Sequence, residues 1–207
     1  KNIRDLAIEH GLQVQIHLHE TQHEVSDAVD QSGLRPIERL NSLGLISKNL
    51  SIQCVHMTTL NDTDIEILKN GNAHVIHCPE SNLKLASGFC ETAKLIANGI
   101  NVALGTDGAA SNNDLDMFEA MRFAALLHKL IDNDPRAVGA EVALEMATIG
   151  GAKVLGLEDK VGSLEVGKRA DLIVVSMDAA RQTPMYNPIS HLVYTTHGDD
   201  VVTTIVN

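Results

Sequence analysis

The chain has 207 residues, 44% of them hydrophobic, and a formal net charge of −11 at pH 7. That length suits one large domain or one and a half, with enough apolar residues to fill a core. The negative charge, together with only two Tyr, three Phe and no Trp, argues against a nucleic-acid partner and favours a small, uncharged or cationic substrate.

Apolar runs and amphipathic segments alternate along the chain, which predicts an α/β fold with a parallel sheet. The runs read as buried strands, and they lie at Val14–His19, Ile52–His56, Ala73–Cys78 and Asn101–Thr106. Each is followed by a segment with helical signals. These four β/α units are half of the eight that close a (β/α)₈ barrel of the TIM type.

Capping residues and apolar spacing place the helices. Thr21 and Glu24 form a T-x-x-E capping box, so a helix should start just after Glu20. The other helices are predicted from a first-turn proline, a cap residue, a closing glycine or helical apolar spacing. They lie near the N-terminus (Ile3–Ala7) and at Pro36–Gly44, Asn61–Leu68, Thr92–Ala97, Met117–Leu127, about Val138–Ile149 and Ala152–Leu155.

The pattern changes near Val161, where a turn, a strand-like pair and another turn follow, and Val201–Val206 is again strand-like. We therefore expect residues 1–161 to form half of a barrel, and 162–207 to form part of a small β domain. The chain starts at Lys1 inside a helical pattern and stops in a strand, so we expect it to be a fragment of a longer protein.

Cysteine content and hydropathy predict a cytoplasmic protein. Cys54, Cys78 and Cys90 are odd in number and lack CxxC spacing, which is typical of reduced thiols in a core. No run approaches the ~18 apolar residues of a membrane span, and we expect no signal peptide. We therefore expect no membrane partner.

Polar residues that bind metal or carry protons follow the predicted strands. They are His17, Glu20, His56, His77 and Asp107. A parallel sheet carries its chemistry where the strands end, and imidazole and carboxylate groups are ligands for Zn²⁺ or a similar cation. His17 and His19 are two apart in a strand, so either both are ligands from a first barrel strand or His17 alone is a ligand from a middle strand. Counting back from Asp107 makes His17 a fifth-strand residue and favours His17 alone.

Each of these residues also has a purely structural interpretation. Glu20 could be a helix-dipole partner or a solvated loop charge rather than a proton carrier. His56 could be a hydrogen-bonded core histidine, and Asp107 could cap the next segment instead of binding metal and accepting a proton. The glycine-rich segment around Asp107 lacks the lysine of a phosphate-binding loop. His77 precedes a turn and favours a structural or substrate-lining role. Surface or packing roles are expected for His10, His23, His74, His128, His191 and His197.

Several segments together resemble the amidohydrolase superfamily, most closely its 5′-methylthioadenosine/S-adenosylhomocysteine deaminase branch, with the triazine chlorohydrolases as near relatives. The matching segments are HLHET (17–21), VH (55–56), HCPESNLKL (77–85), GTDGAASNN (105–113) and GSLEVGKRADLIVV (162–175). The resemblance covers essentially the whole chain.

The resemblance implies a (β/α)₈ barrel, of which this chain supplies strands 5–8, and a β-sandwich built from both chain ends. It implies that His17 and Asp107 bind one divalent metal, most simply Zn²⁺, that Glu20 is the acid and base, and that His56 contacts the attacked centre. His77 and Asn82 are further candidates for substrate binding. The family also needs an H-x-H pair from the first strand, which this chain lacks, so activity is expected only for the complete protein.

These inferences favour a zinc-dependent aminohydrolase that acts on the exocyclic amine of an adenine-type nucleoside, namely 5′-methylthioadenosine, S-adenosylhomocysteine or a similar adenosine. Two alternatives stay open. One is a triazine or other ring hydrolase with a different leaving group. The other is a non-catalytic half barrel that acts in binding or assembly. The expected partners are a small-molecule substrate, the missing N-terminal half and a second copy in a homo-oligomer.

Overall fold

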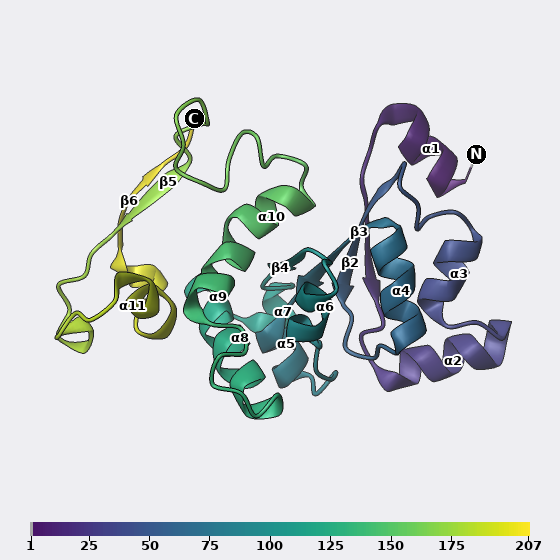
Figure 1. The fold of residues 1–207 in the computed structure, drawn as a ribbon, viewed down its shortest axis with the longest axis horizontal. Helices are drawn as coiled ribbons and strands as arrows, with labels where there is room; N and C mark the ends of the chain where they lie inside the picture. Colours follow the sequence, from purple (N-terminus) through teal and green to yellow (C-terminus); the bar gives the residue numbers. More distant parts are fainter. Residues whose placement is uncertain (1) are drawn as a thin grey trace. The chain divides into compact units, whose positions relative to one another are not determined.

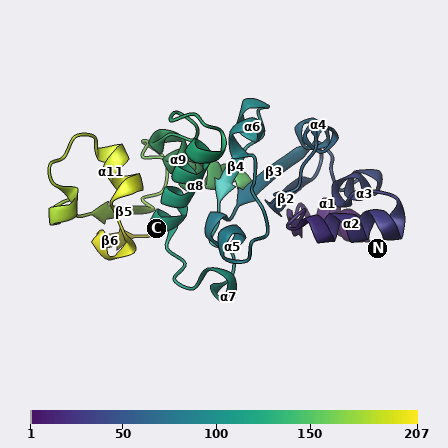
Figure 2. The same cartoon turned by 90° about the horizontal axis from the view of Figure 1, so that it is seen from below.

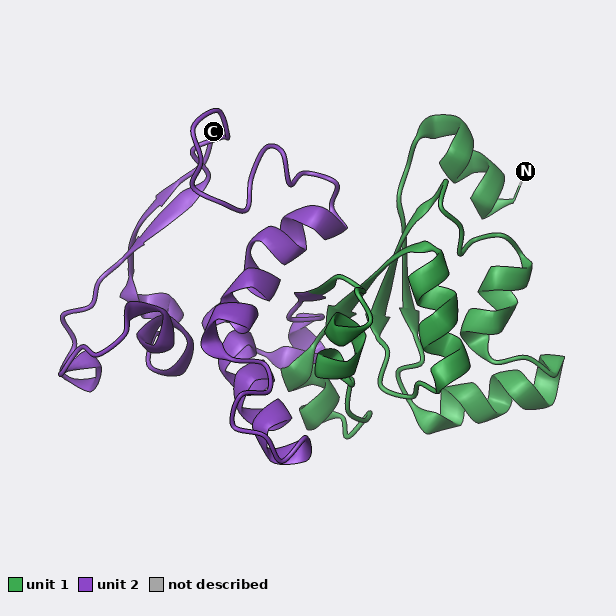
Figure 3. Ribbon diagram, viewed as in Figure 1, with its two compact units in different colours: residues 1–102 green, residues 103–207 purple. Residues whose placement is uncertain are grey.

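The computed structural model describes residues 2–207, and the chain forms two compact units divided between residues 102 and 103 (Figure 3). The β domain predicted from Gly162 onward lies inside the second unit, so its boundary as a separate domain stays a prediction. Within residues 2–207, no helix combines the length and apolar character needed to cross a membrane.

Unit 1 is built on parallel strands. β1 pairs with β2 and β2 with β3, both in parallel, and Leu18 lies opposite His56. The order of the sheet is β1-β2-β3-β4, and β4 begins at the last residue of this unit. All four predicted strands are present, at Val14–Leu18, Ser51–His56, Asn72–His77 and Val102–Leu104. β1 stops one residue before the predicted end, because His19 has a left-handed φ of 52° and leaves the pleat.

The helices of unit 1 follow their predicted caps. Asn61 accepts a hydrogen bond from the backbone N–H of Asp64, as expected for the start of α4. α2, α3 and α4 lie along the same side of the strands (Figures 1 and 2), and they enclose a core in which Ile37, Ile52 and Val75 are fully buried. The helices of this unit are α1 Ile3–His10, α2 Gln22–Ser32, α3 Pro36–Ser42, α4 Asp62–Asn70, α5 Pro79–Lys84 and α6 Thr92–Ala97.

Unit 2 is mainly helical. α8 packs on α9 and on α11, with Met121, Ala124 and Ala125 buried in its apolar face. Both helices predicted over about Val138–Ile149 and Ala152–Leu155 are present with shifted bounds, because the backbone leaves the helical conformation at Thr148, so the first ends at Ala147 and the second begins at Ile149. The helices are α7 Ala109–Asn112, α8 Met117–Ile131, α9 Ala140–Ala147, α10 Ile149–Val154 and α11 Pro188–Tyr194.

A two-stranded antiparallel sheet completes unit 2. β5 (Leu172–Val175) pairs antiparallel with β6 (Val201–Ile205), and short 3₁₀ helices lie between them at Ala180–Gln182 and Gly198–Asp200. The strand-like pair predicted just after Val161 is wrong, because that stretch contains only β5 and its partner comes from the last residues of the chain. Both strands are half-buried or exposed, so this two-stranded sheet contributes little to the core.

All three cysteines are buried and free, as the sequence predicted. Burial raises the pKa of the Cys54 and Cys90 thiols to about 12. These thiols are therefore protonated core residues rather than nucleophiles.

Candidate active site at the strand ends

His17 and His56 meet at the carboxyl ends of β1 and β2. Their rings stack with centroids 5.3 Å apart and an interplanar angle of 28°. His17 is exposed, whereas His56 is 1% exposed. Leu18 lies opposite His56 in the parallel register, and His56 leaves the regular pleat with a left-handed φ of 76°.

His56 is fixed from one side by an amide. Its Nδ1 lies 2.8 Å from Oδ1 of Asn82, a residue of α5 that is 3% exposed. Because an amide oxygen only accepts, this contact places the proton of the neutral ring on Nδ1 and leaves the lone pair on Nε2. Nε2 lies 3.7 Å from Oε2 of Glu20. Asn82, predicted as a substrate contact, therefore acts on the orientation of His56 in this unit.

The Glu20 carboxylate lies between His56 and a serine. Oε1 accepts a hydrogen bond from Oγ of Ser87 at 3.1 Å, while Oε2 faces His56. The side chain of Glu20 is 29% exposed, so it is reachable from solvent. This orientation supports the interpretation of Glu20 as a proton carrier over that of a solvated loop charge.

Ser87 was not identified from the sequence. It reaches Glu20 because the chain at Gly88 passes close to Thr58. A Cβ on Gly88 would lie 2.7 Å from Oγ1 of Thr58, and its φ of 139° also favours glycine. The sequence signal is this glycine, which indicates a close backbone approach but does not predict that Ser87 contacts Glu20.

His19 has a structural role. Its Nδ1 lies 2.8 Å from the carbonyl oxygen of Thr59, and its Nε2 accepts the N–H of Ile37 at 3.1 Å. Both ring nitrogens are therefore used, and burial lowers the pKa of this histidine. Arg35 forms a bidentate pair with the fully buried Asp64 and also donates to the Thr59 carbonyl. The geometry favours His17 alone as the ligand from β1.

His77 lies at the end of β3 and is 1% exposed. This burial agrees with the structural interpretation.

Asp107 belongs to unit 2, where it follows β4 with a left-handed φ of 62°. Its Oδ2 accepts a hydrogen bond from Oγ of Ser111 at 2.6 Å. The N-cap of α7 is Gly108 rather than Asp107. The carboxylate therefore does not serve as the cap that the structural interpretation suggested.

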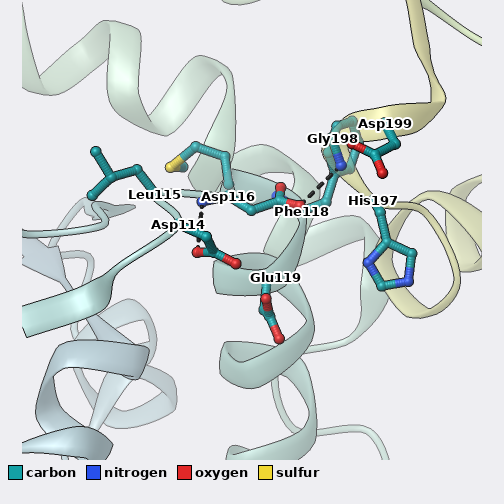
Figure 4. A pocket seen from close by; sticks show the side chains of 9 residues that line it. Asp114, Leu115, Asp116, Phe118, Glu119, His197, Gly198 and Asp199 are labelled. Atoms are coloured by element: carbon teal, nitrogen blue, oxygen red, sulfur yellow. Dashed lines mark hydrogen bonds between the residues drawn. The ribbon is translucent and has the colours of Figure 1, made fainter. Parts of the chain in front are cut away.

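Unit 2 also contains a cavity of about 590 Å³ that includes none of the predicted site residues (Figure 4). Asp116 accepts the N–H of Gly198 across it. Burial and the neighbouring Asp114 raise the pKa of Glu119. The other lining residues are Leu115, Met117, Phe118, His197 and Asp199.

The amidohydrolase family matches residues 1–207. A 5-methylthioadenosine/S-adenosylhomocysteine deaminase of Teredinibacter turnerae is 54% identical over 189 residues, which are 91% of this chain and 42% of the relative. A protein of the same name from Saccharophagus degradans is 49% identical over 205 residues, which are 99% of this chain and 45% of the relative. The chain thus spans about half the length of the curated relatives it matches.

Two solved structures are similar in fold. An adenosine deaminase from Xanthomonas campestris with bound zinc has a TM-score of 0.95 and 45% identity, covering 99% of this chain and 46% of that one. An atrazine chlorohydrolase from Arthrobacter aurescens complexed with zinc has a TM-score of 0.88 and 25% identity, covering 98% and 44%.

Proposed function

Because the chain belongs to the amidohydrolase family, we propose that the complete protein hydrolyses the exocyclic amine of an adenine-type nucleoside. The candidate substrates are 5′-methylthioadenosine, S-adenosylhomocysteine and adenosine. The observation that carries the proposal is the Glu20 carboxylate, which is oriented by Ser87 and lies 3.7 Å from Nε2 of His56. The names of the relatives at 49–54% identity support the substrate class.

In this proposal residues 1–161 are strands 5–8 of a (β/α)₈ barrel and residues 162–207 are part of a small β-sandwich. The parallel pairing of β1, β2 and β3 and the coverage of 42–46% of the relatives support a half barrel. The other half supplies an H-x-H pair of metal ligands.

We place His17 and Asp107 on one metal ion, and the donor set fits zinc. His17 offers an exposed imidazole, whereas both ring nitrogens of His19 are used by the backbone. Asp107 follows β4, the strand after β3 in the order of the sheet, and strand ends of a barrel share one rim. Zinc, when bound, lowers the pKa of a coordinated water from ~15.7 to about 7.

The side chains then divide the proton transfers. Asp107 takes the first proton of the attacking water, and Nε2 of His56 accepts a hydrogen bond from the same water. Glu20 protonates the ring nitrogen next to the attacked carbon, so that no negative charge builds up on the ring. As the C–O bond forms and the C–N bond breaks, Asp107 passes its proton to the leaving amine, and the hydroxyl proton returns to Glu20. Ammonia and a ring carbonyl result, and each proton carrier contributes roughly 10²–10⁴-fold.

The test uses the complete protein loaded with zinc, with adenosine as substrate and ammonia release as the readout. Glu20→Gln keeps zinc but loses about 10²–10⁴-fold in kcat, whereas Glu66→Gln, an exposed carboxylate of α4, keeps full activity. His17→Ala and Asp107→Ala lose zinc, while His23→Ala, 85% exposed, retains it. Full zinc content in both ligand variants, or wild-type kcat in Glu20→Gln, would refute the assignments.

A ring hydrolase with another leaving group is the second candidate, supported by the likeness to an atrazine chlorohydrolase. Chloride release from a chlorotriazine, compared with ammonia release from adenosine, separates the two. A complete protein that binds zinc but turns over neither substrate would instead favour a binding or assembly role.

A further inference from the structure

Glu24 caps α2 in an unusual way. The backbone N–H of Glu24 donates to Oγ1 of Thr21 at 3.1 Å, which is half of the predicted capping box. In the usual box the glutamate side chain then returns to the N–H of the cap residue. Here it reaches further back: Oε1 accepts the N–H of His19 at 3.0 Å, and Oε2 accepts the N–H of Glu20 at 2.6 Å.

Those two N–H groups belong to a strained turn. His19 has a φ of 52°, in the left-handed region that is unfavourable for a non-glycine residue. A carboxylate that accepts two backbone N–H groups forms strong, charge-assisted hydrogen bonds. Glu24 therefore holds the chain in a turn that it would otherwise leave.

Thr58 holds the same turn from its carbonyl side. Its N–H donates to the carbonyl oxygen of His19 at 2.9 Å, and its Oγ1 donates to the carbonyl oxygen of Glu20 at 2.7 Å. The peptide group before the Glu20 Cα is thus held by Glu24 at its N–H and by Thr58 at its carbonyl, and the peptide group after it is held by Thr58. With Ser87 on Oε1, little freedom is left to the Glu20 side chain.

We propose that Glu24 is a positioning residue for the reaction, acting through the backbone of Glu20. The inference rests on the proposed function, because it takes Glu20 as the proton carrier. A shift of about 1 Å in a reacting group can cost about 10²-fold in rate. Loss of the Glu24 carboxylate frees the N–H side of the turn and allows such a shift.

The decisive variant is Glu24→Gln. A glutamine can accept one of the two N–H groups, but its amide NH₂ then faces the other, donor against donor. The matched control is Glu38→Gln. Glu38 occupies the same position in α3, but its side chain accepts the N–H of Arg35 at 2.8 Å rather than an N–H of the Glu20 turn.

Kinetics of the complete zinc-loaded protein give the first readout. Glu24→Gln lowers kcat about 10–10²-fold, with zinc content and KM unchanged, since only the proton carrier is displaced. Glu38→Gln loses similar thermal stability and keeps its kcat. A wild-type kcat in Glu24→Gln, or an equal loss of kcat in both variants, would overturn the proposal.

A second readout does not depend on activity. Hydrogen exchange at the amides of His19 and Glu20 becomes faster in Glu24→Gln and is unchanged in Glu38→Gln. Unchanged exchange in Glu24→Gln would refute the claim that Glu24 holds the backbone of Glu20, whatever the protein catalyses. A wild-type protein without deaminase activity would refute the proposed function instead. The exchange result would still decide whether Glu24 holds the backbone of Glu20.

Discussion

The two carboxylates proposed for catalysis, Glu20 and Asp107, each accept a hydrogen bond from a serine hydroxyl. The two serines lie at very different distances from them along the chain. Ser87 lies 67 residues from Glu20, whereas Ser111 lies four residues from Asp107. The geometry of Glu20 therefore depends on the folded framework of unit 1. The serine hydrogen bond to Asp107 comes from within one local turn of unit 2, so the two regions should respond differently to substitution.

Breaking the framework of unit 1 should have the largest effect. Asp64→Asn leaves Arg35 without the partner of a buried pair, which typically costs about 3–5 kcal/mol. The expected result is a fall of that size in the free energy of unfolding, measured with urea. Asp62→Asn is the control, because Asp62 is 91% exposed in its pair with Lys94 and should cost at most ~1 kcal/mol. Equal effects of the two substitutions would show that the buried pair does not support the framework.

Removing each serine hydroxyl tests the contrast directly. Ser111→Ala frees a proposed metal ligand and should weaken zinc affinity about 10–100-fold, as expected when a group that orients a ligand is lost. Ser87→Ala frees a proton carrier and should lower kcat about 10-fold while zinc affinity stays unchanged. Zinc titration and steady-state kinetics on the complete protein separate the two. If either variant produced the effect expected of the other, the roles assigned to Glu20 and Asp107 would be exchanged.

The smallest expected effect concerns acid stability in unit 2. Burial lowers the pKa of His128 below its ordinary value of 6.5, and Lys129 adds to this, although Asp132 opposes it. The unfolded chain then binds more protons than the folded one as the pH falls through 6.5, so stability is lost on acidification. His128→Gln removes this contribution, and its unfolding midpoint should fall less steeply than that of the wild type between about pH 7 and pH 5. Parallel pH profiles would contradict the prediction.

The same contrast explains what could be predicted from the sequence. Strands and capped helices depend on local patterns, so β1, α4 and α6 were found within a residue or two. α11 was missed, although Asn187 followed by Pro188 is a recognisable helix start, with Asn187 accepting the N–H of Ser190. The strand-like pair after Val161 was wrong because β5 pairs with β6 across a long connection that no local pattern encodes.

The candidate site follows the same rule. His17, Glu20, His56 and Asp107 stand directly after or at the end of apolar runs, so their position along the strands was readable. The partners were not, because Ser87 and Asn82 reach Glu20 and His56 only after folding. His19 was ambiguous for the same reason: its distant contacts with Thr59 and Ile37 remove it from the ligand set.

His19, His56 and Asp107 share a left-handed backbone, with φ values of 52°, 76° and 62°. Glycine adopts this conformation without penalty, so each position trades stability for the side chain it carries. At the half-buried Asp107, a directed-evolution campaign scored only on heat resistance would therefore reward glycine and erase the carboxylate, whereas glycine in place of the buried His19 or His56 would leave a cavity. Libraries meant to improve this scaffold should hold His19, His56 and Asp107 fixed. They should seek stability elsewhere, for instance in the largely exposed sheet of β5 and β6.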